Sequence, residues 1–273
     1  MTSHREIVAL RRLVWKHWKE HGRHDLPWRK TVDPYKILVS EVMLQQTQVP
    51  RVIEKYKAFL KRFPTVRALA HAPLSDVLQE WSGLGYNRRG KYLHDAAKMI
   101  VDEYNGNFKE ALQHSLPGVG PYTRAAVRVF AFNEPHTMIE TNVRSVFLHH
   151  WDDLCKSGRH IQDAKVADSQ LVPFIEKAAE DQDPRTWHWA LMDYGSHLKK
   201  IHGNPSRKSA HHAKQSKFEG SVRQVRGAIL RELHAGPSSL RDLRFEADRK
   251  DEALAGLERN GLIVKEGRKW RIK

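Results

Sequence analysis

The feature that most constrains the fold is a proline–glycine turn that is followed by an acid twenty residues later. Pro117 ends one helical pattern, and the two glycines of segment 116–120 permit positive φ angles and close backbone approach. Residues 123–132 then read as a new helix, whose first N–H groups would point at an anion such as a phosphate. Glu140 would lie near whatever group the turn holds. These five turn residues alone fit an ordinary loop between helices equally well.

The charge and composition favour a polyanionic partner. The formal net charge is +15 and the pI is about 9.9, which nucleic acid binding explains most simply; a solvated basic surface is the alternative. No apolar run approaches the length of a membrane span, and the N-terminus has no apolar signal core. We therefore expect a cytoplasmic, nucleoid-associated protein that is not secreted and has no membrane partner.

Metal binding by cysteine or histidine clusters is not expected. The single cysteine, Cys155, excludes an internal disulfide and an all-cysteine metal cluster. The histidine pairs 149–150 and 211–212 are adjacent instead of four residues apart, and they have no cysteine partners nearby. Zinc sites usually combine such spaced ligands, so no zinc site is predicted.

Helical periodicity dominates the first two hundred residues. Apolar residues recur every three or four positions, and Pro, Gly and Asp separate the segments. Strand signal is nearly absent before residue 218, so residues 1–198 are predicted to form an all-α domain and the chain to be mainly α. The predicted helices are 5–21, 35–45, 49–62, 74–80, 90–104, 108–114, 123–132, 143–151, 171–179 and 187–199.

Two further regions follow this domain. Residues 199–217 hold six Lys or Arg and no acid, which predicts a basic linker or loop. Within residues 218–273 the pattern predicts helices at 222–233, 238–243 and 248–260, and strands at 262–264 and 269–272 around a Glu266-Gly267 turn. This order is typical of a small winged-helix domain, which can bind DNA or serve as an interaction module.

Several motifs resemble those of the MutY-type adenine DNA glycosylases. This family belongs to the helix–hairpin–helix superfamily, which also contains endonuclease III, and the resemblance covers about residues 8 to 198. The run at 40–49 is highly specific, whereas the hairpin marks only the superfamily. Besides segment 116–120, the motifs are Leu26-Pro27-Trp28-Arg29, Asp33-Pro34-Tyr35, the run at 40–49, Trp81-Ser82-Gly83-Leu84-Gly85-Tyr86 and Glu140-Thr141-Asn142-Val143.

The resemblance implies a helix–hairpin–helix DNA glycosylase fold and a role in base excision repair. The expected enzyme is a monofunctional, monomeric glycosylase that flips a nucleotide out of double-stranded DNA and hydrolyses its N-glycosidic bond. The expected substrate is a damaged or mismatched pair, with adenine opposite 8-oxoguanine or guanine. Two alternatives stay open: a thymine/uracil mismatch or hypoxanthine glycosylase, and a catalytically impaired protein that binds lesions.

Two carboxyl groups stand where the family has its catalytic pair. Glycosidic cleavage needs an acid that protonates the leaving base and a carboxylate that stabilises the sugar cation. Glu41 lies in an apolar helical stretch where burial would raise its pKa, and the resemblance makes it the general acid; a surface carboxylate is the alternative. Glu140 stands where the superfamily carries aspartate. Glutamate has one methylene more than aspartate, so the enzyme could be fully active, slow, or adapted to a changed substrate. Alternatively, Glu140 only caps the local structure.

Tyr122 and Asn142 complete the expected catalytic group. Bifunctional members of the superfamily carry a lysine nucleophile at the position of Tyr122. Tyrosine cannot form a Schiff base, so no β-lyase activity is expected. Asn142 matches a residue that helps to position the catalytic acid or water. A structural role is the alternative for both residues.

A further set of residues is expected to contact DNA. Gln45, Gln46 and Tyr86 match residues that enter the duplex beside the extruded base, although Gln45 can also be a helix-surface residue. The family's second tyrosine is replaced by Asn87, which weakens the case for 8-oxoguanine readout. The other expected contacts in this domain are Arg88, Leu116, Gly118, Val119, Gly120 and Thr123.

The positions of the family's iron–sulfur cysteines carry other residues. At the usual spacing they fall on Lys199, Ser206, Ser209 and Gln215, after a matching helix that contains 192–195. None of these side chains can hold iron as a thiolate would, so we expect no cofactor and no iron–sulfur cluster. The region is expected to contact phosphates directly, or else to be a solvated linker. Its expected DNA contacts are Lys199, Lys200, Arg207 and Lys208.

Overall fold

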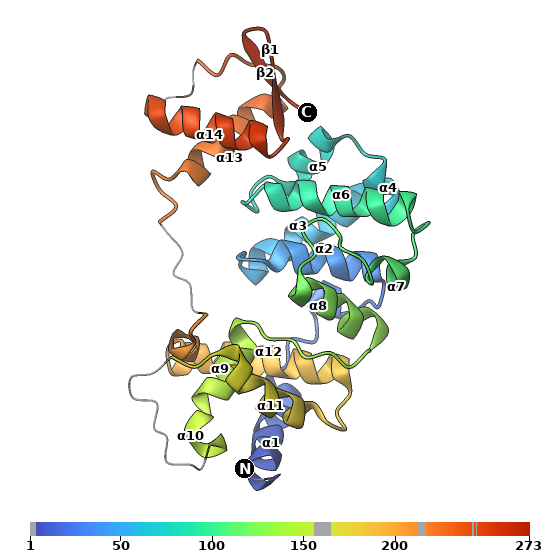
Figure 1. Ribbon diagram of the computed structural model, residues 1–273, viewed down its shortest axis with the longest axis vertical. Coiled ribbons are helices and arrows are strands. Elements are labelled where there is room, and N and C mark those ends of the chain that lie inside the picture. The colour runs from blue at the N-terminus through green and yellow to red at the C-terminus, as the bar shows by residue number, and fades with distance from the viewer. Residues whose placement is uncertain (1–3, 156–164, 212–216, 242, 244) are drawn as a thin grey trace. The chain divides into compact units, whose positions relative to one another are not determined.

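The computed structural model describes residues 4–155, 165–211, 217–241, 243 and 245–273 (Figure 1). The chain divides into two compact units. The first contains residues 1–34 and 121–214, and the second contains residues 35–120 and 215–273. Among the described residues, no helix is long and apolar enough to cross a membrane.

The first unit is built around two long helices that begin and end it in sequence. Helix α12 packs along α9 and against α1, and α11 covers the other side of α1 and α9. The apolar core between them includes the fully buried Trp187 and Phe147. The unit's helices are α1 (His4–His21), η1 (Pro27–Arg29), α8 (Pro121–Phe132), α9 (Thr141–His149), α10 (Trp151–Leu154), α11 (Asp168–Ala179), α12 (Pro184–Ile201) and η2 (Pro205–Lys208).

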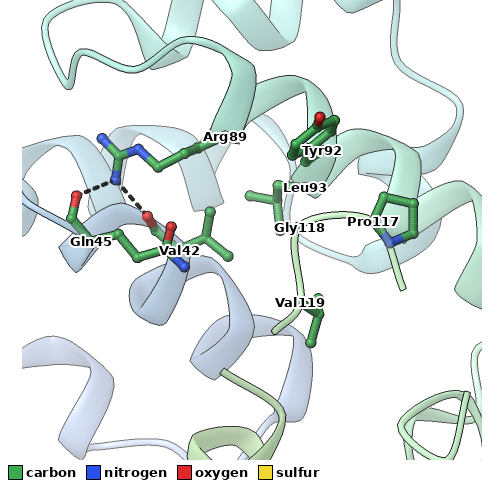
Figure 2. A pocket seen from close by; sticks show the side chains of 8 residues that line it. All are labelled: Val42, Gln45, Arg89, Tyr92, Leu93, Pro117, Gly118 and Val119. Atoms are coloured by element: carbon green, nitrogen blue, oxygen red, sulfur yellow. Dashed lines mark hydrogen bonds between the residues drawn. The ribbon is translucent and has the colours of Figure 1, made fainter. Parts of the chain in front are cut away.

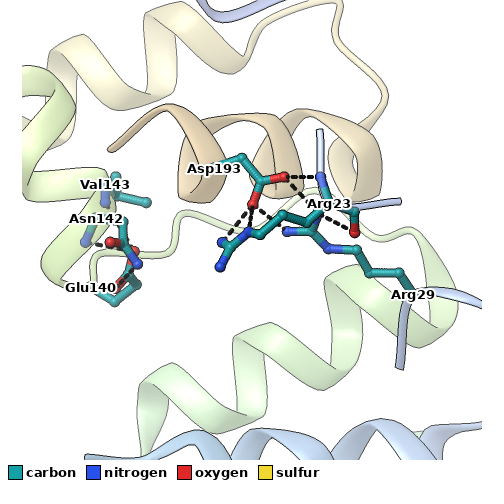
Figure 3. Close-up of polar contacts among 6 residues, drawn as sticks. All are labelled: Arg23, Arg29, Glu140, Asn142, Val143 and Asp193. Carbon is teal, nitrogen blue, oxygen red and sulfur yellow. Dashed lines mark hydrogen bonds and ion pairs between the residues drawn. The ribbon is translucent and has the colours of Figure 1, made fainter. Parts of the chain in front are cut away.

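A buried carboxylate joins the segment after α1 to the middle of α12. Asp193 accepts hydrogen bonds from Arg29 Nη1 and Nη2 at 2.8 and 2.9 Å, and from the backbone N–H of Arg23 at 2.7 Å (Figure 3). The side chains of Asp193 and Arg29 are only 1% and 5% exposed. Burial alone would raise the pKa of Asp193, but the bonds and charges of Arg29 and Arg23 outweigh it and lower the pKa.

The second unit holds the remaining helices and a two-stranded sheet. Helix α6 lies against α4 and α5, and α5 also contacts α3. In α2 nearly every side chain from Tyr35 to Met43 is buried, so this helix is surrounded by protein on all sides. The elements are α2 (Pro34–Leu44), α3 (Val49–Arg62), α4 (Val66–Ala70), α5 (Leu74–Trp81), α6 (Arg88–Asp102), α7 (Phe108–Ala111), α13 (Val222–His234), α14 (Ala247–Arg259), β1 (Ile263–Glu266) and β2 (Lys269–Ile272).

The C-terminal residues form a small domain that packs on α5. Strands β1 and β2 pair in antiparallel fashion, with Ile263 opposite Ile272. Their apolar side chains join α13 and α14 in one buried cluster, which also includes Leu78 from α5. Helices followed by this hairpin match the predicted winged-helix order, except in one element.

The predicted helix over 238–243 is wrong for its described residues. Ser238 pairs instead with Trp270 of β2, through hydrogen bonds of 3.0 and 2.8 Å in the two directions. Leu240 has a φ of 59°, which a helix does not allow. Residue 242 lies outside the described residues. The short apolar–polar pattern that predicted a helix here therefore reflects an edge contact with the sheet.

Several other boundaries differ from the sequence-based prediction, and the helix α4 was not predicted. The predicted helix over 143–151 ends at His149, and α10 begins separately at Trp151. Residues 199–201 continue α12, while Pro205–Lys208 form η2, which packs on α9. Much of the described part of the basic stretch is thus folded onto the first unit. Residues 212–216 lie outside the described part.

The buried ion group predicts a large effect of Asp193→Asn on stability. The change removes the negative charge and leaves the buried guanidinium of Arg29 uncompensated, which should lower the free energy of unfolding by about 3–5 kcal/mol. Urea unfolding at neutral pH measures this loss. Because the folded-state pKa of Asp193 is lowered, its stabilising contribution is present above the ordinary pKa of 3.8 and is lost as the pH falls through the lowered value.

Asp25→Asn is the matched control. The side chain of Asp25 is 98% exposed and pairs only with Lys30 at the surface, so its replacement should leave the unfolding midpoint almost unchanged. Equal effects of the two substitutions would contradict a structural role for the Asp193 group.

Candidate functional site

Glu41 lies within the buried helix α2. Its side chain is 8% exposed, and its neighbours Val39, Val42 and Met43 are at most 4% exposed. The burial expected from the apolar stretch is confirmed, and the alternative of a surface carboxylate is excluded.

Arg89 connects the end of α2 to the loop after α5. Its Nη1 donates to the carbonyls of Val42 and Gln45 at 2.7 and 2.6 Å, as Figure 2 shows, and also to that of Met43. Its Nη2 donates to the carbonyls of Leu84 and Gly85, both at 3.1 Å. Burial lowers the pKa of Arg89 to about 10. Sequence patterns did not identify this residue, because its acceptors on α2 are backbone atoms more than forty positions away.

Gln46 and Tyr86 stand on the two segments that Arg89 joins. Both residues have positive φ angles, 55° for Gln46 and 48° for Tyr86, which are uncommon for residues other than glycine. Tyr86 is 37% exposed. The guanidinium of Arg89 lies 5.6 Å from the centre of its ring, and that of Arg223 lies 5.3 Å away. An exposed aromatic ring is thus held in one position by cations.

The 116–120 turn is a tight hairpin. The N–H of Val119 donates to the carbonyl of Leu116 at 3.1 Å, and Gly118 has a φ of 69°. A Cβ atom on Gly118 would lie 2.7 Å from the Cβ of Tyr92, whereas one on Gly120 would meet no atom within 4 Å. A cavity of about 40 Å³ lies beneath the hairpin (Figure 2).

The hairpin presents its backbone outward, because its apolar side chains are buried. Leu116 and Val119 are 4% and 7% exposed, and Gly118 and Gly120 are exposed. Helix α8 begins directly afterwards at Pro121, and Thr123 in its first turn is buried. Any ligand of this turn would therefore meet the exposed backbone of the hairpin.

Glu140 is the N-cap of α9. Its Oε1 accepts hydrogen bonds from the backbone N–H groups of Asn142 and Val143 at 2.7 and 3.0 Å (Figure 3). Its Oε2 accepts one from Asn142 Nδ2 at 3.1 Å. The predicted alternative of a local cap is therefore what the carboxylate does structurally. The bonds also fix the position of the carboxylate, which a reacting group requires.

The start of α9 is held against α12 by close backbone contact. A Cβ atom on Gly195 would lie 2.1 Å from the carbonyl oxygen of Asn142, so only glycine fits there. Within the described residues, Asn142 Oδ1 is buried and has no hydrogen-bond partner. This acceptor beside Glu140 is available to a water molecule or a ligand.

The charge state of Glu140 depends on burial and on Lys199. Burial of the carboxyl group raises the pKa of Glu140, while the N–H groups of Asn142 and Val143 and the charge of Lys199 act in the opposite direction. Lys199 is itself half-buried, and burial lowers its pKa. Tyr122 is partly exposed in the first turn of α8.

Two of the residues at the cysteine positions, Ser206 and Ser209, make ordinary hydrogen bonds within the segment 204–211. Ser206 Oγ donates to Asn204 Oδ1 at 2.7 Å, and Ser209 Oγ accepts from the N–H of His211 at 3.0 Å. Both serines are buried. Among the described residues, no cluster of His, Cys, Asp and Glu has the arrangement of a metal site. Gln215 lies outside the described residues. Within the described part of the basic stretch 199–217, the exposed Lys and Arg residues are Lys200, Arg207, Lys208 and Lys217.

The candidate residues fall into a group in each unit. In the first unit, Glu140, Asn142 and Lys199 come together. In the second unit, Gln45 lies beside the hairpin around the small cavity. The second unit also contains Glu41 and a cleft that is lined by Gln45, Gln46, Tyr86 and Arg88.

Comparison with known proteins places the chain among DNA repair enzymes. Residues 39–167 match the family described as HhH-GPD superfamily base excision DNA repair protein. The chain is 33% identical over 272 residues to the adenine DNA glycosylase of Mycolicibacterium smegmatis, covering 90% of each protein. It is 34% identical to the human adenine DNA glycosylase over 70% of this chain, but spans only 36% of that protein. A solved thermostable thymine-DNA glycosylase is similar with a TM-score of 0.61 and 25% identity, covering 76% of this chain and 93% of that structure.

The hairpin geometry predicts opposite effects of alanine at its two glycines. Gly118→Ala combines a left-handed φ with a clash against Tyr92, and should cost about 1–3 kcal/mol of unfolding free energy. Gly120→Ala has neither problem and should be neutral or slightly stabilising. Thermal unfolding of both variants compares them directly. A loss of stability in Gly120→Ala as large as that in Gly118→Ala would contradict this description of the turn.

Proposed function

This chain belongs to the adenine DNA glycosylase family of the HhH-GPD superfamily, and we propose that it removes mispaired adenine from double-stranded DNA. The partner base would be guanine or 8-oxoguanine. The observation that carries the proposal is the identity of 33% over 90% of both chains with one adenine DNA glycosylase, together with the buried carboxyl group of Glu41. The proposed enzyme acts as a monomer and without a metal cofactor.

We assign the role of general acid to Glu41. Protonation of the adenine ring weakens its bond to the sugar, because the base then leaves as a neutral molecule. The side chain of Glu41 lies among buried residues of α2, away from solvent. The flipped base would have to enter the site for this contact, which is the usual route for enzymes that act on bases.

Glu140 and Asn142 are the proposed stabilisers of the sugar cation and of the attacking water. The ionised carboxylate of Glu140 is directed by the start of α9, where hydrogen bonds leave little freedom. The buried Oδ1 of Asn142 can accept a hydrogen bond from that water. After the bond to adenine breaks, water adds to C1′ of the sugar cation and gives up one proton to the carboxylate of Glu140, which leaves free adenine and an abasic sugar.

The proposed enzyme is monofunctional. A β-lyase reaction needs an amine that forms a Schiff base with the opened sugar, and the phenol of Tyr122 cannot supply one. The expected products are therefore adenine and an abasic site in an uncut strand. The exposed cations Lys200, Arg207 and Lys208 would contact phosphates, as would the N–H groups of the hairpin.

Glu41→Gln tests the proposed chemistry. Glutamine keeps the size of the side chain but cannot donate the proton, and general acid catalysis contributes about 10²–10⁴-fold. The single-turnover rate of adenine release from an A·G duplex should fall by at least about a hundredfold, with duplex affinity retained.

Glu54→Gln is the matched control, because Glu54 is exposed on α3 and belongs to no candidate site. It should release adenine at the wild-type rate. Excision by Glu41→Gln within a few-fold of the wild-type rate would remove Glu41 from the reaction.

The pH dependence tests the role of Glu140. Its carboxylate must be ionised, so single-turnover activity should decline as the pH falls through its raised pKa. Lys199→Gln removes a charge that lowers this pKa, so the acid limb of the profile should move to higher pH. Lys199→Arg keeps the charge and should keep the wild-type limb. An identical acid limb in all three proteins, measured with saturating enzyme, would show that Glu140 does not control it.

A further inference from the structure

A second cationic feature lies in the second unit, at the C-terminal domain. A cleft of about 960 Å³ separates helix α13 from the loop 82–89, and the turn after α2 lines its floor. Gln45, Gln46 and Tyr86 are among its lining residues, so it is continuous with side chains already proposed to enter DNA. The cleft is therefore large enough for a polymer strand, and it lies beside the residues that are expected to enter the duplex.

The charge of the cleft has one sign. Arginines from both of its walls line it, and no carboxylate of the described residues does: the arginines are Arg51, Arg88, Arg89, Arg223, Arg226 and Arg231. Arg89 is occupied by backbone carbonyls, as described above. The arginines of α13 lie on the side of the helix that faces the loop. A groove that is lined by cations attracts a polyanion.

Among the described residues, the charges that act on Arg226 are positive. The residue is half-buried in α13. Burial and the positive charges of Arg88 and Arg259 lower its pKa. Such an arrangement costs folding free energy in the absence of an anion, and a bound phosphate would relieve it.

Aromatic rings alternate with the cations. Tyr86 and Phe218 are 37% and 60% exposed, and the guanidinium of Arg223 lies 5.3 and 6.0 Å from their ring centres. Arg223 Nη1 also donates a hydrogen bond of 2.5 Å to the hydroxyl of Tyr86. Exposed aromatic rings beside arginines form the usual platform for unstacked bases of a nucleic acid strand.

We propose that the C-terminal domain uses this cleft to bind one strand of the DNA substrate. Arg226 and Arg231 of α13 neutralise its phosphates, while Tyr86 and Phe218 contact its bases. The winged-helix domain thus binds DNA through α13 and the adjoining loop, instead of through its β-hairpin. The identity of the polymer as DNA rests on the proposed function, whereas the location of the contact rests on the cleft itself.

The test measures the salt dependence of binding by the full chain to an undamaged duplex and to an A·G duplex. Each phosphate contact contributes about 0.9 to the slope of log affinity against log salt concentration. Arg226→Gln/Arg231→Gln should therefore lower the slope by about two and weaken binding to both duplexes by roughly tenfold per contact at 0.1 M salt. The melting temperature should not fall, because removing Arg226 relieves charge repulsion.

Arg268→Gln is the matched control, since Arg268 is an exposed arginine of the same domain in the β-hairpin and outside the cleft. Its slope should match that of the wild type. The exposed Arg231 alone, changed to Gln, gives a second variant whose folding is not in question, and it should lower the slope by about one. An unchanged slope in both cleft variants, or an equal loss in Arg268→Gln, overturns the proposal.

Base release separates this proposal from the proposed function. At enzyme concentrations below saturation, the cleft variants should release adenine more slowly than the wild type, whereas Arg268→Gln should release it at the wild-type rate. A wild-type protein that releases no base but shows the predicted slopes refutes the adenine glycosylase and supports the cleft. Normal base release with unchanged slopes refutes the cleft alone.

Discussion

One half-buried guanidinium fixes the part of the molecule that is proposed to meet the base pair. Arg89 donates to carbonyl groups at the end of α2 and in the loop after α5, and so joins two segments that are distant in sequence. Those segments carry Gln46 and Tyr86 in left-handed backbone conformations. The fork of several donors on one guanidinium lets a single side chain reach carbonyl groups of both segments. The same loop after α5 also lines the cleft beside α13. The position that Arg89 gives to this loop therefore also shapes the cleft at the C-terminal domain.

In the first unit, backbone packing and hydrogen bonds hold the carboxylate of Glu140 in a fixed position. The helix that Glu140 caps is pressed against Gly195 of α12, and α12 is tied by Asp193 to the segment after α1. The proposed reacting group is thus part of the packing instead of the end of a flexible side chain. The segment at the cysteine positions follows the same rule: Ser206 and Ser209 are buried and hydrogen-bonded, so η2 is ordered by polar contacts of the chain itself.

Sequence patterns predicted the local features of this fold but missed the distant ones. Helical periodicity located α3 at Val49–Arg62 with both ends correct, and the apolar neighbours of Glu41 predicted its burial. The partners of Arg89 and Asp193 could not be predicted, because hydrogen bonds across long sequence distances leave no periodic signal. The helix predicted over 238–243 failed for the same reason, since pairing with β2 overrides a weak local preference. The charge of the α13 wall was visible in the sequence, but its position beside Tyr86 was not.

The most direct measurement of the central claim is single-turnover base release by the full chain from a panel of duplexes. The panel contains A·8-oxoguanine, A·G, T·G and U·G pairs, with each product base identified and the strands checked for cleavage. The account predicts release of adenine from the first two duplexes, intact strands, and the same rates in the presence of a chelator. Release of thymine or uracil in preference to adenine, or no release from any duplex at saturating enzyme, would contradict it.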